Sequence, residues 1–156
     1  MDKKRYSLRL NIGYLINRPI GFSRDFNISY SEIFIEPDLN VRNLASEVRF
    51  SRTREGLLLQ AQLQGEIETS CVRCLSPFYQ QVSSKIEELY EFPMRSRDNA
   101  ELIVPEDGYI DLGQIFRDYL LLEIPINMIC KADCKGLCSV CGQNLNEKAC
   151  EHSPSV

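Results

Sequence analysis

The sequence predicts an α+β fold that is mainly antiparallel β: a curved sheet or an open barrel, one packed helix and a C-terminal cysteine-rich tail. The clearest observation is an alternation over residues 57–69, where leucines, Ala61 and Ile67 face one way and glutamines and glutamates the other. An antiparallel sheet with one solvated face requires this period of two. The other two observations are a helical apolar pattern after Asp111 and a concentration of cysteines from Cys130 onward.

Further strands are predicted on both sides of this alternating segment. Residues 78–92 alternate in a similar way from Phe78 to Tyr90, so they are expected to form a neighbouring strand. Turn-forming residues at 18–21 and 55–56 separate the earlier segments. The remaining predicted strands are residues 5–12, 23–30, 32–35 and 45–54.

One helix is predicted to follow Asp111, which is expected to cap it, with Gln114 at the capping-box position. Leu121 and Leu122 widen its apolar face, and Pro125 ends the pattern. The residues at helical spacing are Leu112, Ile115, Phe116, Tyr119 and Leu120. Residues 1–126 are therefore predicted to form a β-rich body, in which residues 93–108 are a surface loop with a candidate short strand at 101–104.

The tail, residues 127–156, is predicted to bind a metal. It holds five of the seven cysteines and the only histidine. Cys138 and Cys141 stand two residues apart before Gly142, a spacing that brings two thiolates to the same side of a tight turn. Four thiolates suit tetrahedral Zn²⁺, and the tail has too few apolar residues to fold by packing alone. The favoured site is Cys134, Cys138, Cys141 and Cys150.

A second arrangement stays open, because seven cysteines and one histidine are enough for two tetrahedral sites. It pairs Cys71 and Cys74 with Cys130 and Cys134, and leaves Cys138, Cys141, Cys150 and His152 for the other site. The single site is favoured because it needs no closure between distant segments. Cys71 and Cys74 lie between two long predicted strands. Three interpretations of this pair stay open: half of a metal site, a free dithiol, or two packed cysteines.

The number of cysteines also indicates the cellular compartment in which the protein is expected. An odd cysteine count and a charged N-terminal segment, Met1–Phe22, without a long apolar run argue against a secreted disulfide protein. A cytoplasmic protein is therefore expected. No membrane segment is predicted, since the longest apolar run is Tyr119–Leu122.

Two motifs resemble a known family. They are Cys71-Val-Arg-Cys74, and the block Cys134-Lys-Gly-Leu-Cys138-Ser-Val-Cys141-Gly-Gln-Asn-Leu-Asn. Together they resemble the YceD family of large ribosomal RNA subunit accumulation proteins. This resemblance implies a factor in the accumulation or maturation of large-subunit rRNA. The family pattern commonly ends Cys-x-Cys, whereas this chain ends Cys150-Glu-His152, and histidine is also a zinc ligand.

Charge and residue content narrow the function classes. A single histidine among thiols and the lack of a glycine-rich phosphate loop predict a protein that is no enzyme and takes no small-molecule substrate. Residues 1–54 carry ten basic and six acidic residues, and residues 55–156 carry eight and sixteen. The basic part predicts contacts from Arg49, Arg52 and Arg54 to an rRNA precursor, and the acidic part predicts a basic ribosomal protein as partner. Thiol redox chemistry at Cys71 and Cys74 is the third class considered.

Overall fold

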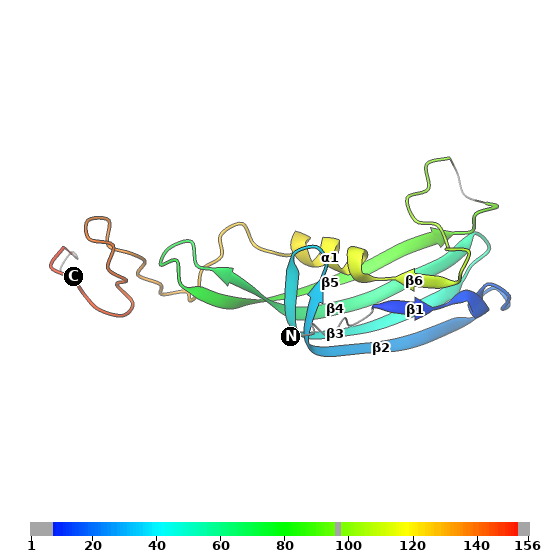
Figure 1. The fold of residues 1–156 in the computed structure, drawn as a ribbon, viewed down its shortest axis with the longest axis horizontal. Coiled ribbons are helices and arrows are strands. Elements are labelled where there is room, and N and C mark those ends of the chain that lie inside the picture. The colour runs from blue at the N-terminus through cyan, green and yellow to red at the C-terminus, as the bar shows by residue number, and fades with distance from the viewer. Residues whose placement is uncertain (1–7, 96–97, 153–156) are drawn as a thin grey trace.

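A computed structural model describes residues 8–95 and 98–152 and contains an open antiparallel sheet (Figure 1). The sheet has the order β2-β3-β4-β5, and a second sheet of two short strands, β1 and β6, lies apart from it. The elements are β1 Arg9–Asn11, a 3-10 helix Gly13–Leu15, β2 Ser23–Ile35, β3 Leu39–Arg52, β4 Gly56–Ser70, β5 Pro77–Glu91, β6 Tyr109–Asp111 and α1 Gly113–Leu122. The prediction of a mainly antiparallel β fold with one helix is confirmed.

The two longest predicted strands are confirmed, and several boundaries differ. The alternating segment is β4, and the strand predicted after it is β5. Residues 23–30 and 32–35 form one continuous strand, β2, and β3 begins at Leu39 rather than at residue 45. The candidate strand at 101–104 supplies only a bridge from Ile103 to Glu91. β6 was not predicted, because three residues that pair with distant β1 carry no periodicity of their own.

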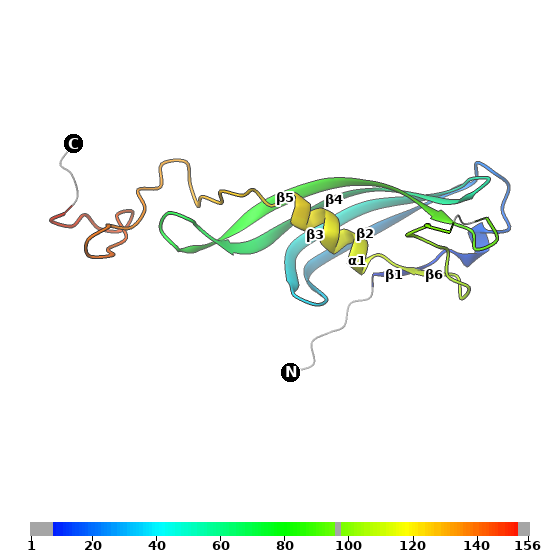
Figure 2. The ribbon, with the colours of Figure 1, turned by 90° about the horizontal axis from the view of Figure 1, so that it is seen from above.

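An irregularity in β3 bends the sheet. It also explains why the sequence pattern predicted that this strand starts at residue 45, after its true beginning at Leu39. Between Arg42 and Ala45 the register with β4 shifts, and Asn43 has φ 50°, in the left-handed region. The alternation of buried and exposed residues shifts by one position there, since Val41 is buried before the shift and Leu44 after it, while both remain on the core face beside the buried residues of β4. Gly65 lies across from the bulge, where a Cβ would stand 2.7 Å from Cγ1 of Val41. The far end of the β2–β3 hairpin therefore turns away from the long axis (Figure 2).

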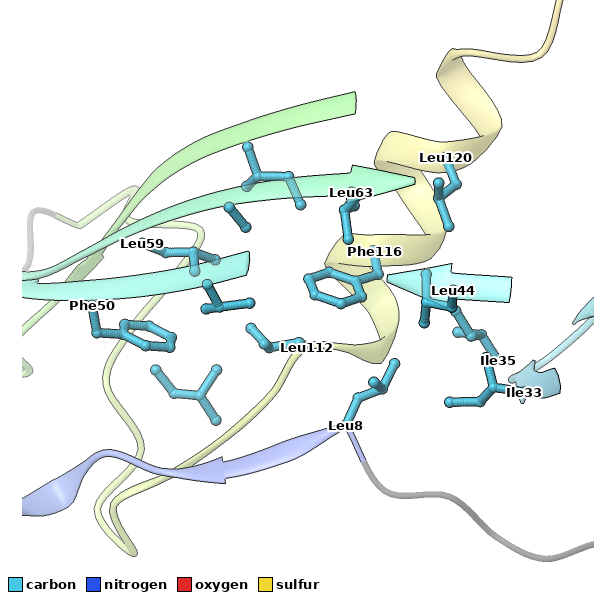
Figure 3. Close-up of a cluster of buried hydrophobic side chains, with 14 of the residues drawn as sticks. Leu8, Ile33, Ile35, Leu44, Phe50, Leu59, Leu63, Leu112, Phe116 and Leu120 are labelled. Carbon is cyan, nitrogen blue, oxygen red and sulfur yellow. The ribbon is translucent and has the colours of Figure 1, made fainter. Parts of the chain in front are cut away.

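Helix α1 packs on the sheet through one row of side chains, Leu112, Phe116 and Leu120, all fully buried (Figure 3). The predicted widening of this face is wrong at Leu122, which is 80% exposed. The predicted cap also differs, because Leu112 is the N-cap and makes no side-chain capping bond. Asp111 instead ends β6, and its carboxylate accepts a hydrogen bond of 2.8 Å from the backbone N–H of Gly113.

Gln114, which was predicted to complete a capping box, does not do so. Its side-chain amide donates to Asp118 at 2.8 Å, one turn further along the helix. The helix therefore begins without the reciprocal bonds that the spacing suggested, because the strand β6 immediately before it sets the backbone direction of Asp111.

An ion pair fastens the bent hairpin to α1. Arg117 donates to both carboxylate oxygens of Asp38, at 2.8 and 3.0 Å, and this contact lowers the pKa of Asp38 below its ordinary value of 3.8. We expect Asp38→Asn to reduce stability at neutral pH. The lowered pKa means that the contribution is present above pH 3.8 and is lost as the pH falls through the folded-state pKa. Urea unfolding of both proteins from pH 7 to pH 2.5 should thus show a difference that disappears in acid, and a constant difference would contradict it.

Candidate metal centres

The Cys71–Cys74 loop joins β4 to β5 at the end of the sheet, as the sequence predicted. The backbone N–H of Cys71 donates to the carbonyl of Ser76 at 2.9 Å, and the N–H of Leu75 donates to the carbonyl of Cys71 at 2.9 Å. The N–H of Arg73 points at Sγ of Cys71, 3.4 Å away. This loop is called knuckle 1 (residues 71–76).

Knuckle 2 (residues 138–143) repeats the same bonds. The N–H of Cys138 donates to the carbonyl of Gln143 at 2.8 Å, that of Gly142 donates to the carbonyl of Cys138 at 2.9 Å, and that of Val140 lies 3.4 Å from Sγ of Cys138. The residue after the second cysteine is left-handed in both loops, with φ 74° at Gly142 and φ 60° at Leu75. Glycine adopts this conformation without the steric cost that a leucine has there.

Each knuckle supplies two thiols to a separate cluster. Knuckle 1 meets the chain that follows α1, so that the thiols of Cys71, Cys74, Cys130 and Cys134 all lie within 4.8 Å of one another. We call this cluster tetrad 1. Its Sγ–Sγ distances are 3.8 Å between Cys71 and Cys134 and 3.6 Å between Cys74 and Cys130. A tetrahedral site with Zn–S bonds of about 2.3 Å has sulfur–sulfur edges of about 3.8 Å, whereas a disulfide needs about 2.05 Å.

Tetrad 2 is built by knuckle 2 and the C-terminal end of the described chain. It consists of Cys138, Cys141, Cys150 and His152, whose ligand atoms also lie within 4.8 Å of one another. Three thiolates and one imidazole form a familiar zinc ligand set. His152 thus occupies the fourth corner of a tetrad.

The structure does not bring together the single site favoured from the sequence. Cys134 lies in tetrad 1, apart from Cys138, Cys141 and Cys150, so the eight residues follow the second arrangement. The entropy cost of bringing distant segments together argued against this arrangement. In the structure, packing of the chain after α1 on knuckle 1 brings these segments together. The ligand roles themselves stay a prediction.

Backbone contacts hold the tail on knuckle 1. The N–H of Val72 donates to the carbonyl of Met128 at 2.9 Å, and the N–H of Leu137 donates to the carbonyl of Arg73 at 3.1 Å. The guanidinium of Arg73 also donates to the carbonyl of Cys134 at 3.2 Å. At Gly136, φ is 75° and a Cβ would stand 3.3 Å from the carbonyl oxygen of Arg73, so this close approach favours glycine.

Two asparagines support the tetrads and were missed from the sequence. Asn146 donates to Sγ of Cys134 at 3.4 Å and accepts from the backbone N–H of Lys135 at 2.9 Å. Asn144 reaches knuckle 1, where it donates to the hydroxyl of Ser76 at 3.2 Å. Both asparagines belong to the block Gly142-Gln-Asn-Leu-Asn146, so their place directly after the second Cys-x-x-Cys turn is the sequence signal for this role. Such outer contacts orient metal ligands.

Hydrogen bonds lower the pKa of Cys71 and Cys74 in tetrad 1 and of Cys138 in tetrad 2, which favours the thiolate that binds a metal. Burial raises the pKa of Cys71, but backbone N–H groups, foremost that of Cys130, outweigh it and lower the pKa to about 6. The backbone N–H of Cys141 is the largest of the contacts that lower the pKa of Cys138 to about 6. In contrast, burial and the neighbouring thiols raise the pKa of Cys130 to about 12. A bound cation would stabilise the thiolate of Cys130, as it does for coordinating thiols generally.

The two tetrads differ in exposure, which predicts an order of metal release. Cys71 is fully buried and Cys134 is 5% exposed, whereas Cys141 and His152 lie at the surface. We expect a chelator to remove one metal ion quickly, from tetrad 2, and a second one slowly. A colorimetric metal indicator should record two phases, of which His152→Ala should accelerate or abolish only the fast one. A single phase in the unaltered protein would contradict this order.

The burial of knuckle 1 also bears on redox chemistry. Cys71 and Cys74 are 0% and 5% exposed, and their sulfurs lie 3.8 and 3.6 Å from those of Cys134 and Cys130, respectively. A redox dithiol exchanges with an attacking thiol and therefore needs access. This geometry favours metal binding over a free dithiol.

The predicted contact arginines have different surroundings. Arg49 makes a paired hydrogen bond to Asp25 at 2.6 and 3.1 Å. Arg52 donates to the carbonyl of Ile16 at 3.0 Å and covers the ring of Phe92 at 4.4 Å, so it stabilises the fold. Arg54 extends from the β3–β4 turn. The basic residues Lys3, Lys4 and Arg5 lie outside the described residues.

Comparison with known sequences covers this whole cysteine region. The sequence model of a family described as large ribosomal RNA subunit accumulation protein YceD matches residues 59–155, which include both knuckles and all eight residues of the tetrads. The chain belongs to the YceD family. The resemblance seen in the two cysteine motifs is thereby confirmed.

Individual relatives extend the comparison. An uncharacterized protein of Mycobacterium tuberculosis is 33% identical over 100 residues, 62% of this chain and 48% of that protein. A large ribosomal RNA subunit accumulation protein YCED homolog 1, chloroplastic, of Arabidopsis thaliana is 47% identical over 47 residues, 30% of this chain and 15% of that protein. The chain thus spans about half the length of the mycobacterial relative, and the match covers a smaller part of the plant relative.

No solved structure matches the chain significantly. Among the described residues, no helix has both the length and the apolar character needed to cross a membrane.

Proposed function

We propose that this chain is a non-enzymatic factor that supports the accumulation of large-subunit ribosomal RNA in the cytoplasm, with a tail organised by two structural zinc ions. The observation that carries the proposal is the family match over residues 59–155. The names of the plant relatives point the same way, since both are large ribosomal RNA subunit accumulation proteins.

Zinc is proposed from the chemistry of the tetrads. Cys₄ and Cys₃His sets with all positions filled by protein ligands are those of structural zinc sites, whereas catalytic sites keep an open position. The sulfur spacings of 3.6 and 3.8 Å in tetrad 1 support this choice. Tetrad 1 joins the tail to the β4–β5 hairpin, so the metal would hold the tail in place relative to the sheet.

The direct partner is proposed to be a precursor of large-subunit rRNA, a basic ribosomal protein, or both. The excess of sixteen acidic over eight basic residues in 55–156 favours a basic protein. The engagement of Arg49 with Asp25 points the same way, because it leaves less positive charge for phosphate. Reversing Glu66, Glu68 and Glu87 should weaken binding to a basic protein, and reversing Arg49, Arg52 and Arg54 should weaken binding to RNA.

The proposal is tested by depletion and complementation in the cells that carry this chain. Depletion should lower the ratio of large- to small-subunit rRNA, and the unaltered chain should restore it. Tagged protein should co-purify with large-subunit precursors, whose RNA and protein partners sequencing and mass spectrometry would identify. An unchanged rRNA ratio together with no recovery of ribosomal precursors would overturn the proposal.

A further inference from the structure

Knuckle 1 holds a leucine in a backbone conformation that favours glycine. Leu75 has φ 60°, and in the described part of the chain Asn43, in the β3 bulge, is the only other residue besides the glycines with a positive φ. Asparagine adopts this region readily, whereas leucine is strained there. The equivalent position of knuckle 2 is Gly142, so the same loop forms without a side chain at this point. The strain at Leu75 therefore indicates a role for its side chain other than forming the loop.

The side chain of Leu75 is not placed there to fill the core. It is 64% exposed, and Val72 in the same loop is 52% exposed. The backbone N–H of Val72 donates to the carbonyl of Met128, and Ile126, two residues before Met128, is almost fully exposed. Three aliphatic side chains thus face solvent from knuckle 1 and from the chain segment beside it. We call them the apolar tip (Val72, Leu75 and Ile126).

The surroundings of the apolar tip are acidic once both tetrads hold zinc. The end of the β4–β5 hairpin, residues 64–84, has two glutamates and one arginine, and this arginine donates to the carbonyl of Cys134. In residues 127–152, three lysines balance one aspartate and two glutamates. Seven thiolates with two zinc ions add three negative charges, which gives this end of the molecule a net charge of −4 (Figure 1).

We propose that the apolar tip binds a basic protein segment of the large-subunit precursor, with Leu75 as the anchor. This inference rests on the proposed function and names the contact site for it. The negative charge attracts a basic segment and repels RNA phosphates. Aliphatic side chains bury apolar surface against a protein, whereas unpaired bases stack on aromatic or guanidinium planes. Holding Leu75 in one exposed conformation also lowers the entropy cost of binding.

Binding of variants of the zinc-loaded full chain tests the inference. The probes are the proteins of the large ribosomal subunit, extracted free of RNA from the cells that carry this chain, and the purified rRNA in parallel. The protein that the chain retains is identified by mass spectrometry, purified and titrated. Leu75→Gly and Leu75→Asn should each raise its dissociation constant about tenfold or more, because the anchor is lost or made polar.

The same two variants separate binding from folding. Glycine and asparagine both adopt a positive φ readily, so both variants should retain two zinc ions per chain and the urea stability of the unaltered protein. Leu75→Met keeps an apolar side chain and should bind within about threefold of the unaltered chain. Val140→Asn is the matched control on knuckle 2, where Val140 is 70% exposed, and it should leave the dissociation constant unchanged.

Several results would overturn the inference. One is equal binding by Leu75→Asn and by the unaltered chain, and another is loss of zinc or stability in both variants, because Leu75 would then serve to hold knuckle 1 together. Retention of rRNA that is lost with Leu75 would place RNA at this site instead. Retention of no large-subunit protein would also refute the contact. The proposed function is decided separately, by the rRNA ratio after depletion.

Discussion

Removal of zinc by a chelator is expected to leave residues 128–152 unprotected from amide hydrogen exchange, while β2 to β5 and α1 keep their protection. The tail buries little apolar surface. Val140 is 70% exposed, and the small cluster beside the tail consists of buried Cys71, Cys74 and Cys134 with partly buried side chains such as Ile129 and Leu137 around them. Structural zinc contributes about 10–16 kcal/mol of folding free energy in small zinc modules, more than this packing can replace. The sheet, in contrast, has its own core of buried residues on the face beneath α1.

Single cysteine variants should divide this effect between the tetrads. Cys130→Ser removes a ligand of tetrad 1 and should free the tail from the hairpin, with exchange rising in knuckle 1 as well. Cys150→Ser should loosen residues 138–152 and leave tetrad 1 loaded, with one zinc ion per chain by elemental analysis. Equal protection of the tail with and without metal would contradict the structural role of zinc.

Phe116→Ala is expected to destabilise the body by about 3–5 kcal/mol, the range for removing a large buried aromatic side chain. Phe116 is fully buried at the centre of the contact between α1 and the sheet, among Leu63, Leu112 and Leu120 (Figure 3). Truncation leaves a cavity that the strands cannot close without losing their pairing. Urea unfolding followed by far-ultraviolet circular dichroism would measure the change.

The control for this prediction lies on the same helix. Leu122 is 80% exposed, so Leu122→Ala removes a leucine side chain without opening a cavity and should change stability by no more than about 0.5 kcal/mol. A similar loss of stability in both variants would show that the helix contributes through its intrinsic propensity rather than through the burial of Phe116.

Local patterns were sufficient wherever one face of an element meets the core along its whole length. The alternation in β4 has buried residues at Leu59, Ala61 and Leu63 and exposed Gln60 and Gln62 between them, as the sequence predicted. Periodicity failed at β3 because the bulge at Asn43 shifts the alternation of buried and exposed residues by one position within a single strand. It also failed at β6, whose three residues are ordered by pairing with β1 rather than by their own composition.

The sequence by itself was sufficient to predict metal binding by the tail, because two Cys-x-x-Cys turns, further cysteines and one histidine supply the ligand types of tetrahedral sites. It did not determine which of these residues lie together. Tertiary structure decided that, since Cys71 and Cys134 are 63 positions apart and meet only where the chain after α1 packs along knuckle 1. Ligand spacing describes loops that close locally, whereas tetrad 1 is closed by backbone hydrogen bonds between distant segments, which no local pattern encodes.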